Sequence, residues 1–279
     1  MMAGGARKLG TASATHHTRA LPRVHLLRRY RATLQGAVAV AAFLLIWHGV
    51  AAARFVTPLF LPGPVDVAEA GVELFSAPQI WNDLLVSGRE FGLGYALAAF
   101  TAIPVGLLMG WYHGFRHMLD PFISFLYATP RVVLLPLFII WFGIGENSKI
   151  ALVFLGAFFS IVISTTVGVR SLDPSLLRVA RSFNATDRHI FRTIALPGSV
   201  PFILTGLRLG IGHALIAVVV GELVAAQAGI GLRIAIAGAT FQTAKVFAGV
   251  VVVASTGMLL TAVLSRLEAR FDRWRPRSG

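Results

Sequence analysis

The chain has 279 residues, of which 56% are hydrophobic and only 13% are charged, and its mean hydropathy is +0.75. Soluble domains carry about a quarter charged residues, so this composition excludes an ordinary soluble protein and indicates several membrane spans. The formal net charge is +13 and cysteine is absent. The lack of cysteine excludes disulfides and thiolate metal sites.

The predicted elements begin with a basic segment, 1–32, which has no apolar core and is expected to be a disordered tail. One transmembrane domain, 33–266, follows, and a second basic tail occupies 267–279. Six apolar runs in this domain are long enough to cross a bilayer at about 1.5 Å per residue. They cover residues 33–53, 90–111, 122–142, 150–169, 201–226 and 247–264. The sequence therefore predicts an all-α integral membrane protein with six transmembrane helices.

The connections between these runs carry fewer signals. A Pro-Gly-Pro break at 62–64 precedes an amphipathic pattern that predicts a short helix at the outer interface. The second run contains Gly106 and Gly110, whose four-residue spacing favours close approach of another helix. The glycine-containing segment 227–246 is expected to be a loop.

The distribution of arginine and lysine predicts the orientation. Six spans place both termini on one side of the membrane, and the segments on that side hold eighteen of the 25 basic residues. The three loops of the opposite side hold only five. Because basic residues collect on the cytoplasmic side, both termini and the segment 171–200 are expected to be cytoplasmic. This bias explains the net charge without a nucleic-acid partner.

The longest polar interruption in the second half of the chain, 171–208, has the pattern of a helix with marked ends. Asp173-Pro174 predicts an N-cap followed by proline in the first turn. Asn184 is expected to end this helix, because asparagine tolerates the left-handed conformation found at helix ends. The apolar positions between them are Leu176, Leu177, Ala180 and Phe183.

A second short helix is predicted after Asn184, with Ile190 and Phe191 on its apolar side. Leu196-Pro197-Gly198 is expected to end it, and Pro201 to open the fifth span. Two short amphipathic helices at the surface of a membrane protein predict a docking element.

The sequence lacks the motifs of an energy-converting protein. It contains no glycine-rich phosphate loop that ends in lysine, and none of its apolar runs holds a pair of carboxylates. Glu222 is the one carboxylate well inside a predicted span, whereas an ion-driven carrier ordinarily needs ionisable groups near mid-membrane. If this chain moves a substrate uphill, its energy comes from a partner on the cytoplasmic side.

The 171–208 segment resembles the EAA loop of bacterial ABC importer permeases. In that pattern, E-A-A is followed by glycine after four residues and by I-x-L-P ten residues beyond. Arg178-Val179-Ala180, Asn184 and Ile194-Ala195-Leu196-Pro197 stand at these positions. The segments 134–149 and 206–210 also resemble the nitrate, sulfonate and taurine type of permease, and the likeness runs collinearly over about 60–265.

The resemblance implies a type I ABC importer permease in a bacterial inner membrane, paired with a second, usually identical, permease copy. It implies a cytoplasmic ATPase, which binds ATP and Mg²⁺, and an extracytoplasmic substrate-binding protein; the permease itself has no cofactor and is not an enzyme. The loop positions implied to couple to the ATPase are Asp173, Pro174, Leu176, Leu177, Ala180, Arg181, Asn184, Ala185, Phe191, Ile194, Leu196 and Pro197.

Two positions depart from the family pattern. Arg178 stands where the family commonly has glutamate, so an acidic contact has become basic. Asn184 replaces glycine, which is a milder change because asparagine is well tolerated at a left-handed helix end. Both bear on which ATPase the loop fits.

Four polar residues are candidates for the pathway or for contacts between helices: Arg131, Arg208, His213 and Glu222. Arg208 is expected to reach the cytoplasmic interface, and His213 to bond another helix. Glu222, towards the outer end of the fifth span, is expected to pair with Arg131 or Arg233. No metal site is predicted.

The resemblance implies a small organic anion or oxyanion as substrate, such as an aliphatic sulfonate, taurine or nitrate. A pyrimidine or another nitrogenous nutrient is the alternative within the same type of permease. The alternative of a different class is a carrier or channel that works without a partner. A membrane-embedded enzyme would need a polar catalytic cluster within the spans, and the sequence supplies none.

Overall fold

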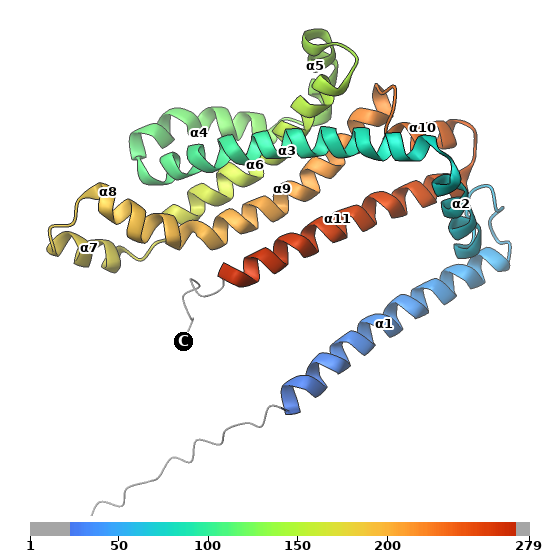
Figure 1. The fold of residues 1–279 in the computed structure, drawn as a ribbon, viewed down its shortest axis with the longest axis horizontal. Coiled ribbons are helices and arrows are strands. Elements are labelled where there is room, and N and C mark those ends of the chain that lie inside the picture. The colour runs from blue at the N-terminus through green and yellow to red at the C-terminus, as the bar shows by residue number, and fades with distance from the viewer. Residues whose placement is uncertain (1–22, 272–279) are drawn as a thin grey trace, which may run out of the picture.

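The computed structural model describes residues 23–271, which form helices joined by short turns (Figure 1). The helices are α1 (Arg23–Ala52), α2 (Pro64–Ser76), α3 (Gln79–Trp111), α4 (His113–Ala128), the 3₁₀ turn η1 (Arg131–Leu134), α5 (Leu135–Phe142), α6 (Glu146–Arg170), α7 (Pro174–Ser182), α8 (Asp187–Ile190), the π turn η2 (Phe191–Ala195), α9 (Leu196–Val224), α10 (Ile230–Ala239) and α11 (Thr243–Phe271). The described part of the chain has five helices long and apolar enough to span a membrane, or six with α4 and α5 as one bent span. The predicted all-helical membrane fold is confirmed.

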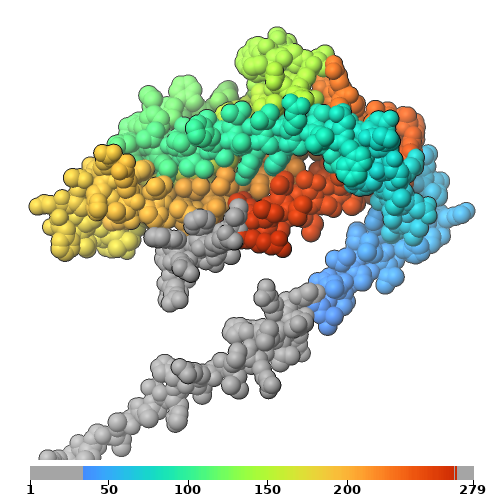
Figure 2. Space-filling view, in the orientation of Figure 1, coloured from blue at the N-terminus to red at the C-terminus, as the bar shows by residue number. Residues whose placement is uncertain are grey.

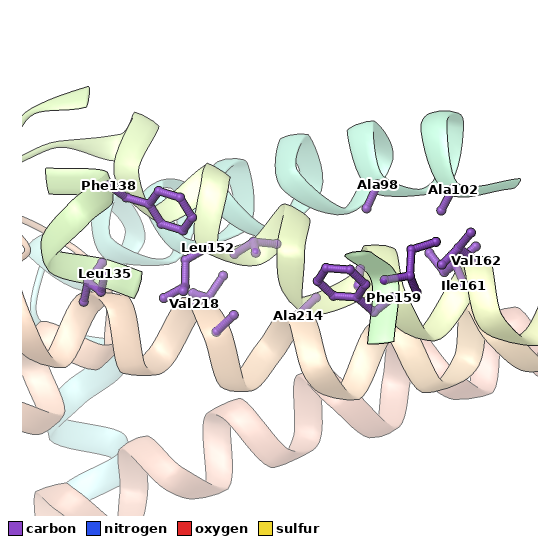
Figure 3. Close-up of a cluster of buried hydrophobic side chains, with 14 of the residues drawn as sticks. Ala98, Ala102, Leu135, Phe138, Leu152, Phe159, Ile161, Val162, Ala214 and Val218 are labelled. Carbon is purple, nitrogen blue, oxygen red and sulfur yellow. The ribbon is translucent and has the colours of Figure 1, made fainter. Parts of the chain in front are cut away.

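The centre of the bundle consists of α3, α6 and α9, which pack side by side (Figure 1). Figure 3 shows Ala98 and Ala102 of α3 directed at Ile161 and Val162 of α6, and all four side chains are fully buried. The small side chains on α3 let the two helix backbones approach closely. Van der Waals packing at such close contacts is a main source of helix association in a bilayer, because moving an apolar side chain from lipid into the protein gains little hydrophobic free energy.

Gly106 of α3 lies at a very close approach between these two helices. A Cβ atom at this position would lie 2.6 Å from Thr165 Cβ and 2.8 Å from the carbonyl oxygen of Val162, so the two backbones would have to separate. We expect Gly106→Ala to destabilise the fold by about 1–3 kcal/mol, as overpacking commonly does. Thermal unfolding in detergent measures this change.

The matched control is Gly92→Ala on the same helix, because a Cβ atom there meets nothing within 4 Å. Alanine favours a helix over glycine by about 1 kcal/mol, so this variant should be as stable as the wild type or more stable. An equal loss of stability in both variants would contradict the α3–α6 packing.

The two ends of the bundle differ in what they contain. The α3–α4 turn, α7, α8 and the end of α11 lie at one end, at the left of Figure 1, and we call this the basic end. The helices α2 and α10 lie at the opposite end. The predicted cytoplasmic segments that the structure describes therefore gather at one end of the bundle.

The first helix stands apart from the bundle. Figure 2 shows α1 as a rod that meets the remaining helices only near α2. There Trp47 donates a hydrogen bond to the carbonyl of Pro62 at 3.0 Å and packs beside Phe247 of α11. The helix begins at Arg23, inside the segment predicted as a tail; the other tail residues, 1–22 and 272–279, lie outside the described part of the chain.

The third predicted span is not one straight helix. Between Ala128 and Arg131 the chain bends by 94°, so that α4 is followed by η1 and α5 in a new direction. Thr129 precedes a proline, a position from which the helical conformation is disfavoured, and its ψ is 128°. Pro130 continues the extended backbone with a ψ of 110°.

Two further expectations about local structure are wrong. Leu196-Pro197-Gly198 does not end a helix, because α8, η2 and α9 run on as one apolar span over Asp187–Ala225. In η2, the Leu196 N–H donates to the carbonyl of Phe191, and this wider turn admits Pro197, which has no N–H to donate. The segment predicted as a loop after the fifth span contains the helix α10, whose first turn is held by side chains from α3 and α9.

Candidate functional site

The helix α7 has the ends that its sequence predicts. Asp173 accepts a hydrogen bond from the backbone N–H of Ser175 at 2.8 Å, and this bond lowers the pKa of the Asp173 carboxyl. Pro174 occupies the first turn. Asn184 has a φ of 56°, the left-handed conformation expected at the end of this helix, and Ala185 N–H donates to the carbonyl of Ala180 at 3.1 Å.

One side of α7 is apolar and exposed. Leu176, Val179 and Phe183 have exposed fractions of 53%, 55% and 82%, and their spacing places them on one face, which we call the α7 apolar face. Leu177 and Ala180 are half-buried towards the bundle, whereas Arg181 is exposed. A short helix with three large apolar side chains in solvent has the form of an anchor for a groove in another protein.

The turn that carries α7 is fixed to the bundle through α8 and η2. Ile190 and Ala195 are buried, and the ring of Phe191 packs edge-on against Trp111 of α3 at 5.3 Å between centroids. The predicted loop residues Ile194 and Pro197 are half-buried, and Leu196 is exposed. The segment α8–η2 therefore connects α7 to α3 and α9.

Beneath α7 lies a polar cavity of about 530 Å³ between α3, α4, α6 and α7. Its lining includes Arg116, Arg170 and Arg181, with Asp187 as the acid among them. Arginine side chains therefore lie on the side of α7 that faces the bundle as well as on its exposed side.

The opposite end of the bundle contains a buried polar cluster built around Glu222. Ser87 donates to Glu222 Oε1 at 2.5 Å, and the backbone N–H of Gly231 donates to Oε2 at 2.6 Å. Lys149 Nζ lies 2.8 Å from Glu90 Oε1, and the side chains of this pair are 3% and 0% exposed. The cluster joins α3, α6, α9 and α10.

The same cluster holds the first turn of α10. Asp83 accepts from Gly229 N–H at 2.9 Å and pairs with Arg233 at 2.5 Å, and Ser87 accepts from Ile230 N–H at 3.0 Å. Glu222 supplies the third acceptor, through Gly231. The free N–H groups at this helix end are thus satisfied by side chains of α3 and α9.

The pairing predicted for Glu222 is wrong, because Arg233 pairs with Asp83 and Arg131 lies elsewhere. The sequence interpretation also missed Asp83, Glu90 and Lys149, which it placed in loops or at span ends. Asp83 and Glu90 both lie within a helix, because α3 begins at Gln79, eleven residues before the predicted span. The sequence carried only a weak signal for this earlier start.

The other polar candidates fall at two places. Arg208 of α9 pairs with Glu268 of α11 and donates to Ser265 Oγ at 3.2 Å. Arg131 lies with its guanidinium 5.6 Å from the centre of the Tyr127 ring, and His213 Nδ1 lies 2.7 Å from Ser160 Oγ. Arg131 and His213 line one cavity, although they are far apart in the sequence. Among the described residues, no group of three or more metal-ligating side chains could hold a metal ion.

Comparison with known proteins places this geometry in context. A family model described as "binding-protein-dependent transport system inner membrane component" matches residues 102–275. The taurine transport system permease protein TauC of Escherichia coli K12 is 38% identical over 240 residues, which cover 84% of this chain and 87% of TauC. The putative aliphatic sulfonates transport permease protein SsuC of Bacillus subtilis is 34% identical, over 87% of this chain and 88% of SsuC.

A more distant relative is the formylaminopyrimidine transport permease protein ThiX of Halalkalibacterium halodurans, which is 28% identical over 89% of this chain and 98% of ThiX. Among solved structures, an inward-facing MetNI methionine ABC transporter chain has a TM-score of 0.61 at 17% identity, over 70% of this chain and 98% of that one. An amino acid ABC transporter chain has a TM-score of 0.57 at 18% identity, over 72% of this chain and 96% of that one. The fold is thus that of ABC importer permeases, and the chain belongs to the family of binding-protein-dependent transport system inner membrane components: it is a multi-pass, non-catalytic permease subunit of an importer.

Proposed function

We propose that this permease docks a cytoplasmic ATPase through α7 and α8 and pairs with a second copy of itself to enclose the translocation pathway. An extracytoplasmic binding protein delivers the substrate to the opposite end, where α2 and α10 lie. ATP and Mg²⁺ are bound by the ATPase. The four predicted pathway residues belong to this proposal as polar groups within or between the spans.

The observation that supports docking is the α7 apolar face. Three large apolar side chains are exposed on this helix. Asp173 and Asn184 fix its two ends, so the helix is already formed before a partner binds. Preorganised apolar anchors contribute most to binding, because little conformational entropy remains to be lost. Arg178 and Arg181 beside this face favour an acidic rim on the ATPase groove.

The substrate class follows from the relatives. The taurine and aliphatic sulfonate permeases, each more than 30% identical over most of their lengths, support a small organic sulfonate or related oxyanion as substrate. The formylaminopyrimidine permease is less similar, at 28% identity, so the nitrogenous class ranks second.

The test is association of the purified permease with its ATPase. We expect Val179→Asp to weaken this association at least about 30-fold, which corresponds to the loss of a binding anchor of about 2 kcal/mol. The Tm of the permease alone should stay unchanged, because Val179 is exposed before the substitution. Co-purification and surface binding at matched detergent concentrations measure the association, and thermal unfolding of the permease alone measures the Tm.

Ser182→Asp is the matched control, because it adds the same charge to another exposed position of α7, one that carries a small polar side chain and no apolar anchor. This variant should bind the ATPase nearly as well as the wild type. Equal weakening by both substitutions would contradict a role for the apolar face. Substrate uptake by proteoliposomes that contain no ATPase would favour the partner-independent carrier instead.

A further inference from the structure

The bend between α4 and α5 lies against a cavity. Thr129, Pro130 and Arg131 line a space of about 290 Å³ together with residues of α4, α6 and α9. Extended backbone inside a bilayer is tolerated only where it is buried in protein or lines a water-filled space, because its polar groups need partners. In transporters, broken helices of this kind occur at binding sites.

The cavity lies well inside the spans. His213 is 17 residues from the start of α9 and 11 from its end, which runs from Leu196 to Val224. At 1.5 Å per residue, these separations are about 26 Å and 17 Å along the helix. Neither the water nor the headgroups at the two ends of the bundle are therefore close to His213.

The cavity is unlike the other charged places in the bundle, because it holds positive charge without a carboxylate. Lys149, Arg208 and Arg233 each pair with an acid. Arg131 takes part in none of the ion pairs among the described residues, and no aspartate or glutamate lines its cavity. Its described neighbour is the Tyr127 ring, which leaves the donors of the guanidinium edge available.

His213 of α9 brings an imidazole ring to the same cavity. Its Nδ1 lies 2.7 Å from the hydroxyl oxygen of Ser160, a side chain that is 6% exposed. That contact occupies Nδ1 and leaves Nε2 as the nitrogen that can meet a ligand; when the Ser160 hydroxyl donates to Nδ1, Nε2 carries the proton and is a donor. A guanidinium fork from one side and an imidazole from the other suit a group with several oxygen atoms.

We infer that Arg131 and His213 form an anion-binding site at the break between α4 and α5. This site binds the substrate transiently during its passage through the permease. The occupant is a small anion with an oxygen-rich head, such as a sulfonate. The cavity volume is at the lower end of the range for small-molecule pockets, which excludes a bulky substrate. This inference rests on the proposed function, since it names the residues that the sulfonate class would meet.

The experiment is a thermal-shift titration of the purified full-length chain in detergent. The probe is sodium methanesulfonate, and sodium chloride and tetramethylammonium chloride at the same ionic strength are the comparison salts. We expect a saturable rise in Tm with methanesulfonate beyond that with either chloride salt. Arg131→Gln should weaken the apparent affinity at least tenfold, and Arg131→Lys by less, because lysine keeps the charge but loses the two-pronged donor geometry.

The matched control is Arg89→Gln, which removes an exposed arginine paired with Glu146 and should leave the titration unchanged. A wild-type rise no larger than that with chloride, or a full rise in Arg131→Gln, would overturn the anion site. ATPase co-purification, measured on the same preparations, separates the two proposals. If the wild type and Arg131→Gln both bind the ATPase, a failed titration removes the anion site alone, whereas a wild type that binds no ATPase removes the docking proposal.

Discussion

Lys149→Met is expected to destabilise the permease by about 3–5 kcal/mol, the range found when one partner of a buried ion pair is removed. Lys149 is buried beside Glu90: its ammonium lies 2.8 Å from a Glu90 oxygen, and Glu222 belongs to the same buried cluster. Without the lysine, two carboxylates remain in a site closed to water. Thermal unfolding in detergent and the yield of monodisperse protein measure the loss.

Two variants separate this effect from loss of side-chain bulk. The double variant Lys149→Met with Glu90→Gln removes both charges, and we expect it to recover much of the lost stability. Lys245→Met breaks an exposed pair with Glu73 at 2.6 Å and should cost at most about 1 kcal/mol. If Lys149→Met were no more harmful than Lys245→Met, the cluster would be open to water.

Gly229→Ala is expected to have the second largest effect, a loss of about 3 kcal/mol or more, because backbone strain and a collision act together. The φ of Gly229 is 125°, a conformation that side chains rarely adopt, and an added Cβ would lie 2.4 Å from the Glu222 carboxyl carbon. The carboxylate would have to leave the first turn of α10. Thermal unfolding and the rate of proteolysis between α9 and α10 measure the result.

Gly143→Ala isolates the backbone contribution. Gly143 has a φ of 81° and a ψ of 173°, and the ψ of Gly229 is similar, at 161°. A Cβ atom at Gly143, however, would meet nothing within 4 Å. This variant should lose only about 1–3 kcal/mol from the unfavourable conformation. The excess loss in Gly229→Ala then reports the collision with Glu222, and equal losses would argue against the close packing of Gly229 on that side chain.

Local patterns in the sequence predicted the local structures well. The apolar runs locate the spans because a bilayer demands long apolar helices regardless of how they pack. The cap at Asp173 and the left-handed Asn184 were also predictable, since each depends on neighbours within a few residues. Pro130 is visible in the sequence, but the direction of the 94° bend depends on how α5 packs against α6.

The buried cluster was beyond such patterns. Hydropathy places Asp83 outside a span and Glu90 at the very end of one, because a lone acid is costly in a membrane. Lys149 and the first turn of α10 remove that cost, yet Asp83 and Gly229 are 146 residues apart. A partner at that distance is known only when the helices are assembled. The π turn was missed for a different reason, because prolines after a short helix usually mark its end.

The unbroken course of the chain from α8 through η2 into α9 has a mechanical consequence. α9 has 29 residues and is therefore about 43 Å long; if it moved as one body, a tilt of about 10° around its end at Leu196 would move its end at Val224 by about 7.5 Å. That stroke exceeds the width of a water molecule or a sulfonate group. With the π turn as its pivot, one helix can convert a small displacement at the basic end of the bundle into a larger one at the end where α2 and α10 lie.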